Sequence, residues 1–442
     1  MSDIPISPLD AWTAGRLDVG RLSREAIEQW QGERLREVVA WVRERSPLYR
    51  GLYRDLPEDP VRSIGDAASL PLLEREALRD RGPELVCVSL SDIARVVTVP
   101  TTGSTGSPKR LWFTEEDLEI TAEHFRHGMR ALMEPGGRLL VLMPGKSPGS
   151  VGALLQDGLG RDGIDVHAYG FVDDPADVVA CLLGFSADTV VGVPGQIVRL
   201  ARSAAGQRVG RGRIRSVLLS GDHVTPAMRE AIEQAWDCKV FEHYGSTESG
   251  LGGAVQCRAL AGLHVREADL LFEVVDPATG RPLPDGDEGE LVMTTLTRRG
   301  MPLIRFRTGD LVRMATAPCA CGSVLRCVER VIGRKDDVIR LVEGHALSVA
   351  DLDEAVYGVD GVMAFSAVLD RGTDGDRLTV EVETESSSPP AILAEVESRV
   401  RALPAVRGAG LEVIADLQAG SGAQSPAAKQ RITDARGAEA PA

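Results

Sequence analysis

The sequence contains no long apolar stretch. Its most apolar segment, residues 139–143, ends at Pro144, whereas a membrane-spanning helix needs about 20 predominantly apolar residues. An excess of positive charge is also missing, because 50 Lys and Arg residues stand against 65 Asp and Glu residues and the formal net charge is −15. A basic surface is the electrostatic mark of nucleic-acid binding. We therefore expect a soluble protein that binds neither a membrane nor nucleic acid.

Cysteine is scarce as well. The seven cysteines among 442 residues are too few and too unevenly spaced for a disulfide framework. This scarcity indicates a reducing compartment and leaves room for one metal cluster. Residues 1–7 carry neither the basic nor the apolar segment of a secretory signal. We therefore expect a cytoplasmic protein.

The length and the apolar pattern predict a large α/β domain. A chain of this length forms two or three domains. Residues 22–50 have apolar side chains at helical spacing, and from about residue 95 to 330 short apolar runs alternate with helix-like stretches. Such alternation is typical of helices layered on largely parallel strands. Residues 269–296 instead predict an antiparallel hairpin, with its turn at residues 276–280.

The last hundred residues predict a separate, small α+β lid domain. Strands are expected at residues 362–369 and 378–383, a helix around 392–403 and a final strand at 411–414. We place the domain boundary between residues 1–334 and 335–442, and expect the tail from about residue 418 to be flexible because it is rich in Gly, Ser, Ala and Pro.

The strongest local signal is a stretch of small and hydroxylic residues after the strand-like residues 96–99. Small side chains let backbone N–H groups approach a polyphosphate, and hydroxyls and a lysine add donors. The Walker A pattern is absent, and taken alone the stretch also fits a flexible turn. Its residues are Thr101, Thr102, Gly103, Ser104, Thr105, Gly106, Ser107, Pro108 and Lys109.

Three more motifs follow in a fixed order, at residues 242–248, 305–311 and 333–337. With these four motifs the sequence resembles the adenylate-forming enzymes, the superfamily of acyl-CoA synthetases, carrier-protein-loading domains and luciferases. Residues 46–49 and 70–73 are similar to the phenylacetate-CoA ligase branch. The resemblance covers residues 25 to 435, and implies a large adenylate-forming domain with a small β hairpin or barrel-like part and a mobile C-terminal domain.

The resemblance implies a role for each motif residue. Thr101 to Lys109 would form the phosphate loop around ATP, Tyr244 would stack on adenine beside Gly245, and Thr247 would contact the α-phosphate. Glu248 would hold Mg²⁺, which prefers carboxylate oxygens. Asp310 would bind the ribose hydroxyls, with Arg334 in support. In isolation Tyr244 fits a half-buried core residue equally well, and Asp310 a turn after Gly309.

The same resemblance assigns the hinge, the lysine and the acyl pocket. Asp336 would be the hinge about which the small domain rotates, and Gly344 would line the pantetheine tunnel. Lys429 is the only lysine after Lys335 and so the candidate adenylation lysine, although no glycine precedes it and its spacing to Arg431 is one residue short. The acyl pocket would include Gly192, Gly221 and His243, with the polar residues Lys146 and Asp222 nearby.

A second constellation predicts a metal site. Cys257, His264, Cys319 and Cys321 offer three thiolates and one imidazole, a closed tetrahedral set of the structural-zinc type. The spacing is not that of a common zinc finger, but members of the phenylacetate-CoA ligase branch resemble it here. Three core cysteines and a surface histidine are the alternative. Cys327 is interpreted as a core residue.

These inferences predict an AMP-forming acid–CoA ligase, with ATP, Mg²⁺ and CoA and with structural zinc. The acid would be aryl or arylacetic. An enzyme that passes the acyl group to a carrier-protein phosphopantetheine or to an amine is the first alternative, and an inactive zinc-stabilised nucleotide-binding protein is the second. A homodimer is a further possibility that the sequence leaves open.

Overall fold

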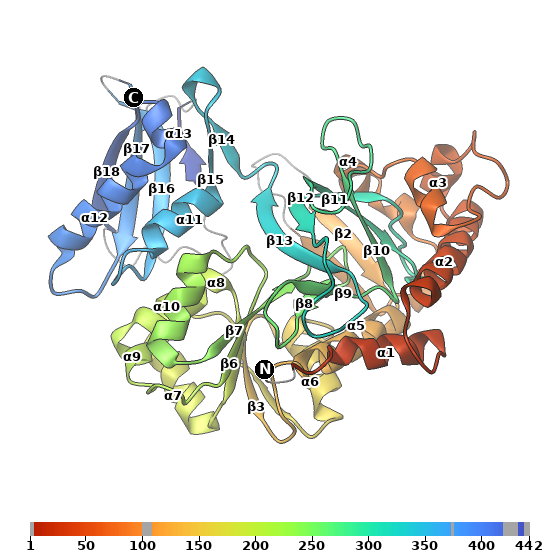
Figure 1. Cartoon of the computed structure of the whole chain (residues 1–442), viewed down its shortest axis with the longest axis horizontal. Coiled ribbons are helices and arrows are strands. Elements are labelled where there is room, and N and C mark those ends of the chain that lie inside the picture. Colours follow the sequence, from red (N-terminus) through yellow and green to blue (C-terminus); the bar gives the residue numbers. More distant parts are fainter. Residues whose placement is uncertain (1–3, 100–107, 373–374, 419–431, 437–442) are drawn as a thin grey trace. The chain divides into compact units, whose positions relative to one another are not determined.

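The computed structural model (Figure 1) describes residues 4–99, 108–372, 375–418 and 432–436. The chain folds into two compact units. Unit 1 comprises Met1–Gly136, Lys146–Asp165 and Phe241–Ile332, and unit 2 comprises Gly137–Gly145, Val166–Val240 and Gly333–Ala442. The last hundred residues thus share a unit with residues 166–240. The boundary expected between residues 334 and 335 stays a prediction.

Unit 1 begins with helices whose ends are set by local sequence. In α2 the Ser23 hydroxyl accepts from Ala26 N, and the helix ends at Ser46, which caps α3 just before Pro47. The predicted helical region is therefore confirmed, and α1 precedes it. The helices of this part are α1 (Pro8–Leu17), α2 (Arg24–Arg45), α3 (Pro47–Leu52), α4 (Arg75–Asp80), α5 (Glu115–Met129) and α6 (Val151–Gly160), with 3₁₀ turns Ile64–Ser69, Gly82–Leu85 and Leu90–Asp92.

The strands of unit 1 are antiparallel. β1 (Arg95–Val99) pairs with β2 (Lys109–Phe113) in a separate hairpin, and β10 (Leu270–Val275) pairs with β11 (Glu288–Thr295) as the sequence predicts. The other strands are β8 (Ala254–Gln256), β9 (Leu263–Val265) and β12 (Phe306–Met314), while β7 (Lys239–Tyr244) and β13 (Cys327–Arg334) cross the unit boundaries. Outside the predicted hairpin, the expectation of largely parallel strands is wrong for residues after 244. β7, β8, β9 and β13 pair antiparallel, and the described residues between them include no helix of the kind that joins parallel strands.

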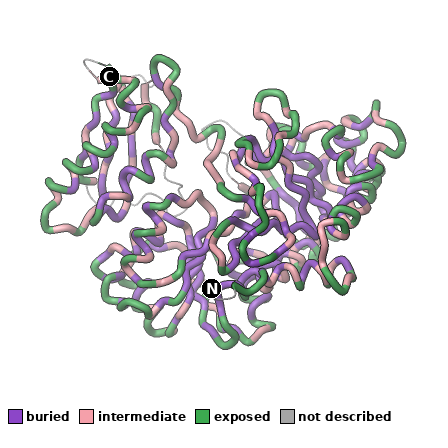
Figure 2. Tube along the Cα trace, viewed as in Figure 1, coloured by how far each residue is buried: buried purple, intermediate pink, exposed green. Residues whose placement is uncertain are grey.

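Unit 2 contains the expected parallel strands. β3 (Arg138–Leu142), β5 (Thr189–Gly192) and β6 (Ser216–Ser220) pair in parallel, since each crossover passes through helices. β4 (Asp165–Ala168) lies beside β3. The helices are α7 (Pro175–Phe185), α8 (Pro194–Arg202), α9 (Ala204–Gln207) and α10 (Pro226–Trp236). β3, β5 and β6 are largely apolar and almost fully buried, whereas β4 is partly exposed (Figure 2).

The C-terminal part of unit 2 has its own four-stranded sheet, in the order β18-β17-β16-β19. The predicted strands and helix are confirmed, and one further strand, β19, pairs in parallel with β16. Helix α11 packs on α10 within this unit. The elements are β14 (Val338–Arg340), η4 (Val342–Gly344), β15 (Ala346–Ser348), α11 (Val349–Tyr357), β16 (Ala364–Arg371), β17 (Asp376–Glu383), α12 (Pro389–Ala402), α13 (Pro404–Gly408), β18 (Glu412–Leu417) and β19 (Ile432–Asp434).

Each unit has a hydrophobic core of its own. The core of unit 1 joins α2, the β10–β12 strands and Tyr244, whereas that of unit 2 joins β3, β5 and β6 to α10, α11 and the C-terminal sheet. Among the helices of the described ranges, none combines the length and the apolar character that crossing a membrane requires.

Candidate active site and metal centre

The predicted phosphate loop is closed by a strand pair. Residues 101 to 106 lie outside the described residues, but the stretch leaves β1 at Val99 and enters β2 at Lys109, and these two residues face each other in register. The Lys109 ammonium forms an ion pair with the carboxylate of Glu248, whose side chain is buried. The structure thus brings the end of the predicted phosphate loop to the motif of residues 242–248, which continues past the end of β7.

That motif forms a tight turn over residues 246–250. The Ser249 hydroxyl accepts from Ser246 N at 3.0 Å, and the Thr247 carbonyl accepts from Gly250 N at 3.1 Å. The turn begins at Gly245, where a Cβ atom would lie 2.4 Å from the carbonyl oxygen of Leu251. Only glycine permits this approach. The turn therefore holds Thr247 and Glu248 in fixed positions at the end of β7.

Tyr244 and Asp310, 66 residues apart, meet in the core of unit 1. The Tyr244 hydroxyl donates to Asp310 Oδ2 at 2.6 Å, and the ring packs edge-on against Phe272. Burial and then the Asp310 carboxylate raise the pKa of Tyr244 well above its usual value, so the phenol stays protonated and donates. Asp310 lies within β12, which excludes the turn interpretation. The residues expected to bind adenine and ribose are thus neighbours.

Buried cationic and imidazole groups surround the turn of residues 246–250. Arg266 donates to the Ser249 carbonyl at 2.9 Å, and the guanidinium of Arg298 lies 5.0 Å from the centre of the Phe113 ring. Burial lowers the pKa of Arg298 to about 10, which still leaves it charged at neutral pH. Burial, with the charge of Arg266, lowers the pKa of His243 to about 4, so its imidazole is neutral. Sequence reasoning missed both arginines because no motif contains them.

The residues predicted for the hinge and the CoA path lie in unit 2, as do two residues of the predicted acyl pocket, and Lys429 is not described. Arg334 ends β13, Asp336 lies in the turn before β14, and Gly344 ends η4 and is exposed. Gly192 ends β5, and Gly221 follows β6. These residues belong to unit 2, whereas Tyr244, Asp310 and His243 belong to unit 1. Lys429 lies outside the described residues, between β18 and β19.

The four predicted metal ligands do come together in unit 1. The ligand atoms of Cys257, His264, Cys319 and Cys321 lie within 4.8 Å of one another, and all four residues are buried. Cys257 Sγ is 3.7 Å from Cys319 Sγ, and Cys321 Sγ is 3.5 Å from His264 Nε2. Tetrahedral zinc with bonds of about 2.3 Å to sulfur and 2.0–2.1 Å to nitrogen requires separations of about 3.8 and 3.6 Å. The donor set and its spacing therefore fit zinc.

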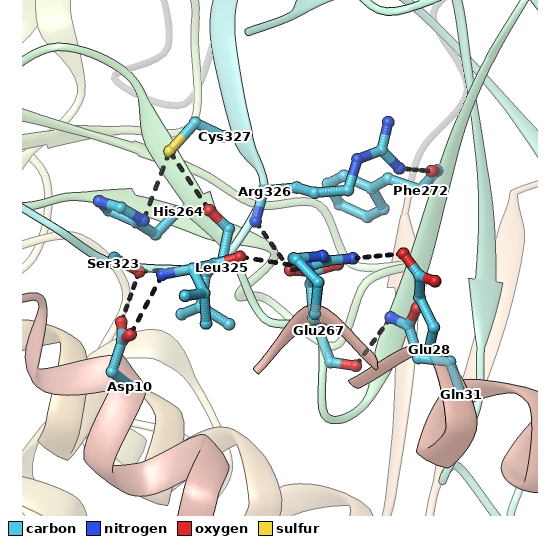
Figure 3. Close-up of polar contacts among 12 residues, drawn as sticks. Asp10, Glu28, Gln31, His264, Glu267, Phe272, Ser323, Leu325, Arg326 and Cys327 are labelled. Carbon is cyan, nitrogen blue, oxygen red and sulfur yellow. Dashed lines mark hydrogen bonds and ion pairs between the residues drawn. The ribbon is translucent and has the colours of Figure 1, made fainter. Parts of the chain in front are cut away.

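Cys327 is buried as expected, but it also contacts the cluster. Its Sγ lies 3.3 Å from His264 Nδ1, a contact drawn in Figure 3, whereas Cys321 Sγ lies close to Nε2 of the same ring. Nδ1 is thereby engaged while Nε2 faces the other thiols, an arrangement that fixes the ring orientation in metal sites. The contact between Cys327 and His264 follows from the register of β13 and β9, in which the two residues are paired. The sequence alone does not give this register.

N-terminal helices hold the loop that carries Cys319 and Cys321. Asp10 of α1 accepts from the Ser323 hydroxyl and from Val324 N, as Figure 3 shows. Glu267 accepts from Arg326 N at 2.7 Å and from Arg24 at 2.6 Å. The cluster therefore lies beside α1, β9 and β13, and its four ligand residues are buried beneath an exposed loop.

Comparison with known proteins decides the family. The model of the AMP-binding enzyme family matches residues 66–296. The chain belongs to this family. Within it the chain falls in the phenylacetate-CoA ligase-like branch: it is 30% identical to phenylacetate-coenzyme A ligase of Thermus thermophilus over 381 residues, covering 83% of both chains. The AMP-binding enzyme is also 27% identical to the Escherichia coli ligase of the same name, over 83% of this chain and 84% of that one.

Solved structures support the fold of this AMP-binding enzyme. A 2-hydroxyisobutyryl-CoA ligase in complex with 2-HIB-AMP superposes with a TM-score of 0.78 at 22% identity, covering 93% of this chain and 89% of that one. The mixed α/β architecture expected from the sequence is thereby confirmed.

Proposed function

We propose that this AMP-binding enzyme is an AMP-forming acid–CoA ligase. A carboxylate attacks the α-phosphorus of ATP, pyrophosphate leaves, and the thiolate of CoA then displaces AMP from the acyl-adenylate. The observation that carries the proposal is the meeting of Tyr244 with Asp310 beside the Lys109–Glu248 pair. Within one unit these groups offer an aromatic ring, a hydrogen-bond acceptor for the ribose hydroxyls, a cationic donor for phosphate oxygens and a carboxylate ligand for a cation.

The ATP-binding roles follow from this arrangement. Tyr244 and Asp310 bind the nucleoside, while the stretch from Thr101 to Lys109 and the Thr247 turn bind the phosphates. The supporting role of Arg334, a residue of unit 2, stays a prediction. Glu248 holds Mg²⁺, because a carboxylate is the ligand that this hard cation prefers. Bound Mg²⁺ neutralises phosphate charge, and ATP binding would exchange the Lys109–Glu248 ion pair for contacts of both side chains with the phosphates and their cation.

The acyl group binds at the carboxyl ends of β3, β5 and β6. Met143, Val193 and Gly221 follow these three strands, and ligands of parallel sheets bind at this edge. In unit 2 an ideal Cβ on Gly221 would lie 3.5 Å from Met143 Cε and 3.8 Å from Val193 Cγ2. Gly192 completes the proposed pocket of unit 2, which we assign to an aryl or arylacetic acid, in line with the names of the relatives. The role of His243, a residue of unit 1, stays a prediction.

Lys429, Asp336 and Gly344 are proposed to act at different stages. Lys429 supplies the positive charge that stabilises the attack of the carboxylate on ATP. Asp336 serves as the hinge for the C-terminal segment, and Gly344 lines the path of the CoA thiol. Of the strands nearest to Lys429 in the sequence, β18 pairs with β17 and β19 pairs with β16.

We propose that the metal cluster holds structural zinc and that the enzyme is cytoplasmic. Three cysteines and one histidine would fill all four positions of a tetrahedral site. No position would remain for water or substrate, so zinc would stabilise the loop that carries Cys319 and Cys321 and take no part in the reaction.

Pyrophosphate exchange tests the proposed function. The purified full chain is incubated with ATP, Mg²⁺, labelled pyrophosphate and, in separate reactions, phenylacetate, benzoate, hydroxyphenylacetates and 2-hydroxyisobutyrate. We expect acid-dependent exchange, trapping of the acyl-adenylate by hydroxylamine, and AMP release when CoA is added. Exchange without CoA-dependent turnover would favour transfer to a carrier protein or an amine. ATP binding without exchange for any acid would overturn the ligase proposal.

A further inference from the structure

Within unit 2, His223 joins two segments that are far apart in the sequence. It lies in the loop of residues 221–225, between β6 and α10, and its side chain is mostly buried. His223 Nε2 lies 2.6 Å from Asp353 Oδ2 of α11, and Nδ1 lies 3.4 Å from Asp222 Oδ1. The imidazole is therefore held between a carboxylate of its own loop and a carboxylate of the C-terminal segment.

The charges around His223 keep it protonated. Burial lowers the pKa of His223, but Asp222 and Asp353 outweigh this effect and raise the pKa to about 10. Burial raises the pKa of Asp353 to about 6, against the opposing influence of His223. Glu354, next along α11, faces the start of α10 and accepts from Ala227 N at 3.0 Å. Between about pH 6 and pH 10, an imidazolium thus lies between two carboxylates.

The loop that His223 anchors borders the proposed acyl site. Gly221, two residues earlier, has a φ of +91° and approaches Met143 and Val193 at the carboxyl ends of the parallel strands. The Asp222 carboxylate also accepts from the backbone N of His223 at 3.0 Å. A shift of the His223 ring would therefore be passed to Asp222 and Gly221 through covalent bonds and this hydrogen bond.

We propose that His223 is a positioning residue, which links the 221–225 loop at the acyl site to helix α11 of the C-terminal segment through Asp222 and Asp353. This inference rests on the proposed ligase function and goes beyond it, since it makes acid binding depend on the docking of α11. When α11 is docked, the loop is held in the conformation that binds the acid. When Asp353 withdraws, only Asp222 restrains the imidazole.

Steady-state kinetics of the first half-reaction test the link. In pyrophosphate exchange with phenylacetate, or with the acid of the panel that reacts fastest, we expect His223→Gln and Asp353→Asn each to raise KM for the acid about tenfold. KM for ATP should change less than twofold. The KM of the double variant for the acid should be no higher than that of either single variant, because each of the three variants removes the contact between His223 and Asp353.

A matched control separates this role from general loosening of the interface. Arg199 of α8 forms an ion pair with Glu383 of β17, which joins the same two parts of unit 2 but does not touch the 221–225 loop. Glu383→Gln should leave the acid KM within twofold.

Wild type and Glu383→Gln should show a rising acid KM below about pH 6, where Asp353 gains a proton, and Asp353→Asn should lack this rise. Equal effects of Glu383→Gln and His223→Gln, or the same pH profile in Asp353→Asn, would overturn the proposal.

Hydrogen exchange provides a measurement that does not depend on turnover. In the unliganded full chain, His223→Gln and Asp353→Asn should speed amide exchange in residues 221–225 by at least fivefold, and Glu383→Gln should not. Unchanged exchange in this loop would refute the link even if the wild type proves inactive. Absence of acid-dependent exchange of pyrophosphate in the wild type would instead count against the ligase function, so the two failures are distinguishable.

Discussion

Replacing one cysteine of the cluster provides the sharpest stability test. In Cys319→Ser the serine hydroxyl is a poor zinc ligand, and the variant should lose both metal and stability. A metal that joins Cys257 to Cys319 closes a loop between residues 62 positions apart. The chain-entropy relation for a cross-link gives about 4 kcal/mol for a loop of about 60 residues. For a folding unit of this size, that loss lowers the melting temperature by on the order of 10 °C.

The assay combines metal analysis with thermal unfolding. Wild-type protein, purified without added metal, should contain about one zinc per chain by elemental analysis. Cys319→Ser should contain much less and unfold at the lower temperature, and a strong chelator should bring the wild type down to the same value. Cys327→Ser serves as the control, because Cys327 lies in the same buried cluster but contacts His264 Nδ1 rather than the shared ligand position. It should retain zinc.

Two results would refute this reasoning. One is wild-type protein that is free of zinc yet fully stable, since a metal that is absent cannot restrain the loop. The other is Cys319→Ser with stoichiometric zinc, since four ligands in the observed geometry would then not be required. Turnover that follows zinc content while the melting temperature stays constant would instead indicate a catalytic metal.

Three predictions concern the nucleotide site. Tyr244→Phe removes the hydrogen bond to Asp310, which should raise KM for ATP about tenfold, corresponding to about 1.4 kcal/mol, and an unchanged KM would mean that the pair is only structural. Glu248→Gln should reduce Mg²⁺-dependent adenylation by about 10²-fold with little change in melting temperature, because the amide keeps the shape and loses the charge; a large fall in melting temperature with unchanged Mg²⁺ dependence would contradict the role. Lys429→Ala should reduce acyl-adenylate formation by about 10³-fold while thioester formation from supplied acyl-adenylate persists, and equal loss in both half-reactions would contradict the assignment.

The sequence by itself determined the local features of this protein. The turn after β7 follows from a short run in which Gly245 permits a close approach that any side chain would prevent. The β10–β11 hairpin and the C-terminal strands likewise follow from alternation and turn residues that act over a few positions. Family membership was accessible for the same reason, because each of the four motifs is contiguous.

Only the tertiary structure decided which distant groups share an environment. The antiparallel pairing after residue 244 and the strand β19 depend on neighbours that the local pattern does not specify. Cys327 was expected to be a core residue, yet its place opposite His264 depends on the register of β13 and β9. Arg298 and the His223–Asp353 contact carry no local signal at all. Their charges and pKa values arise from burial and from partners that the fold brings together, and a linear sequence contains neither directly.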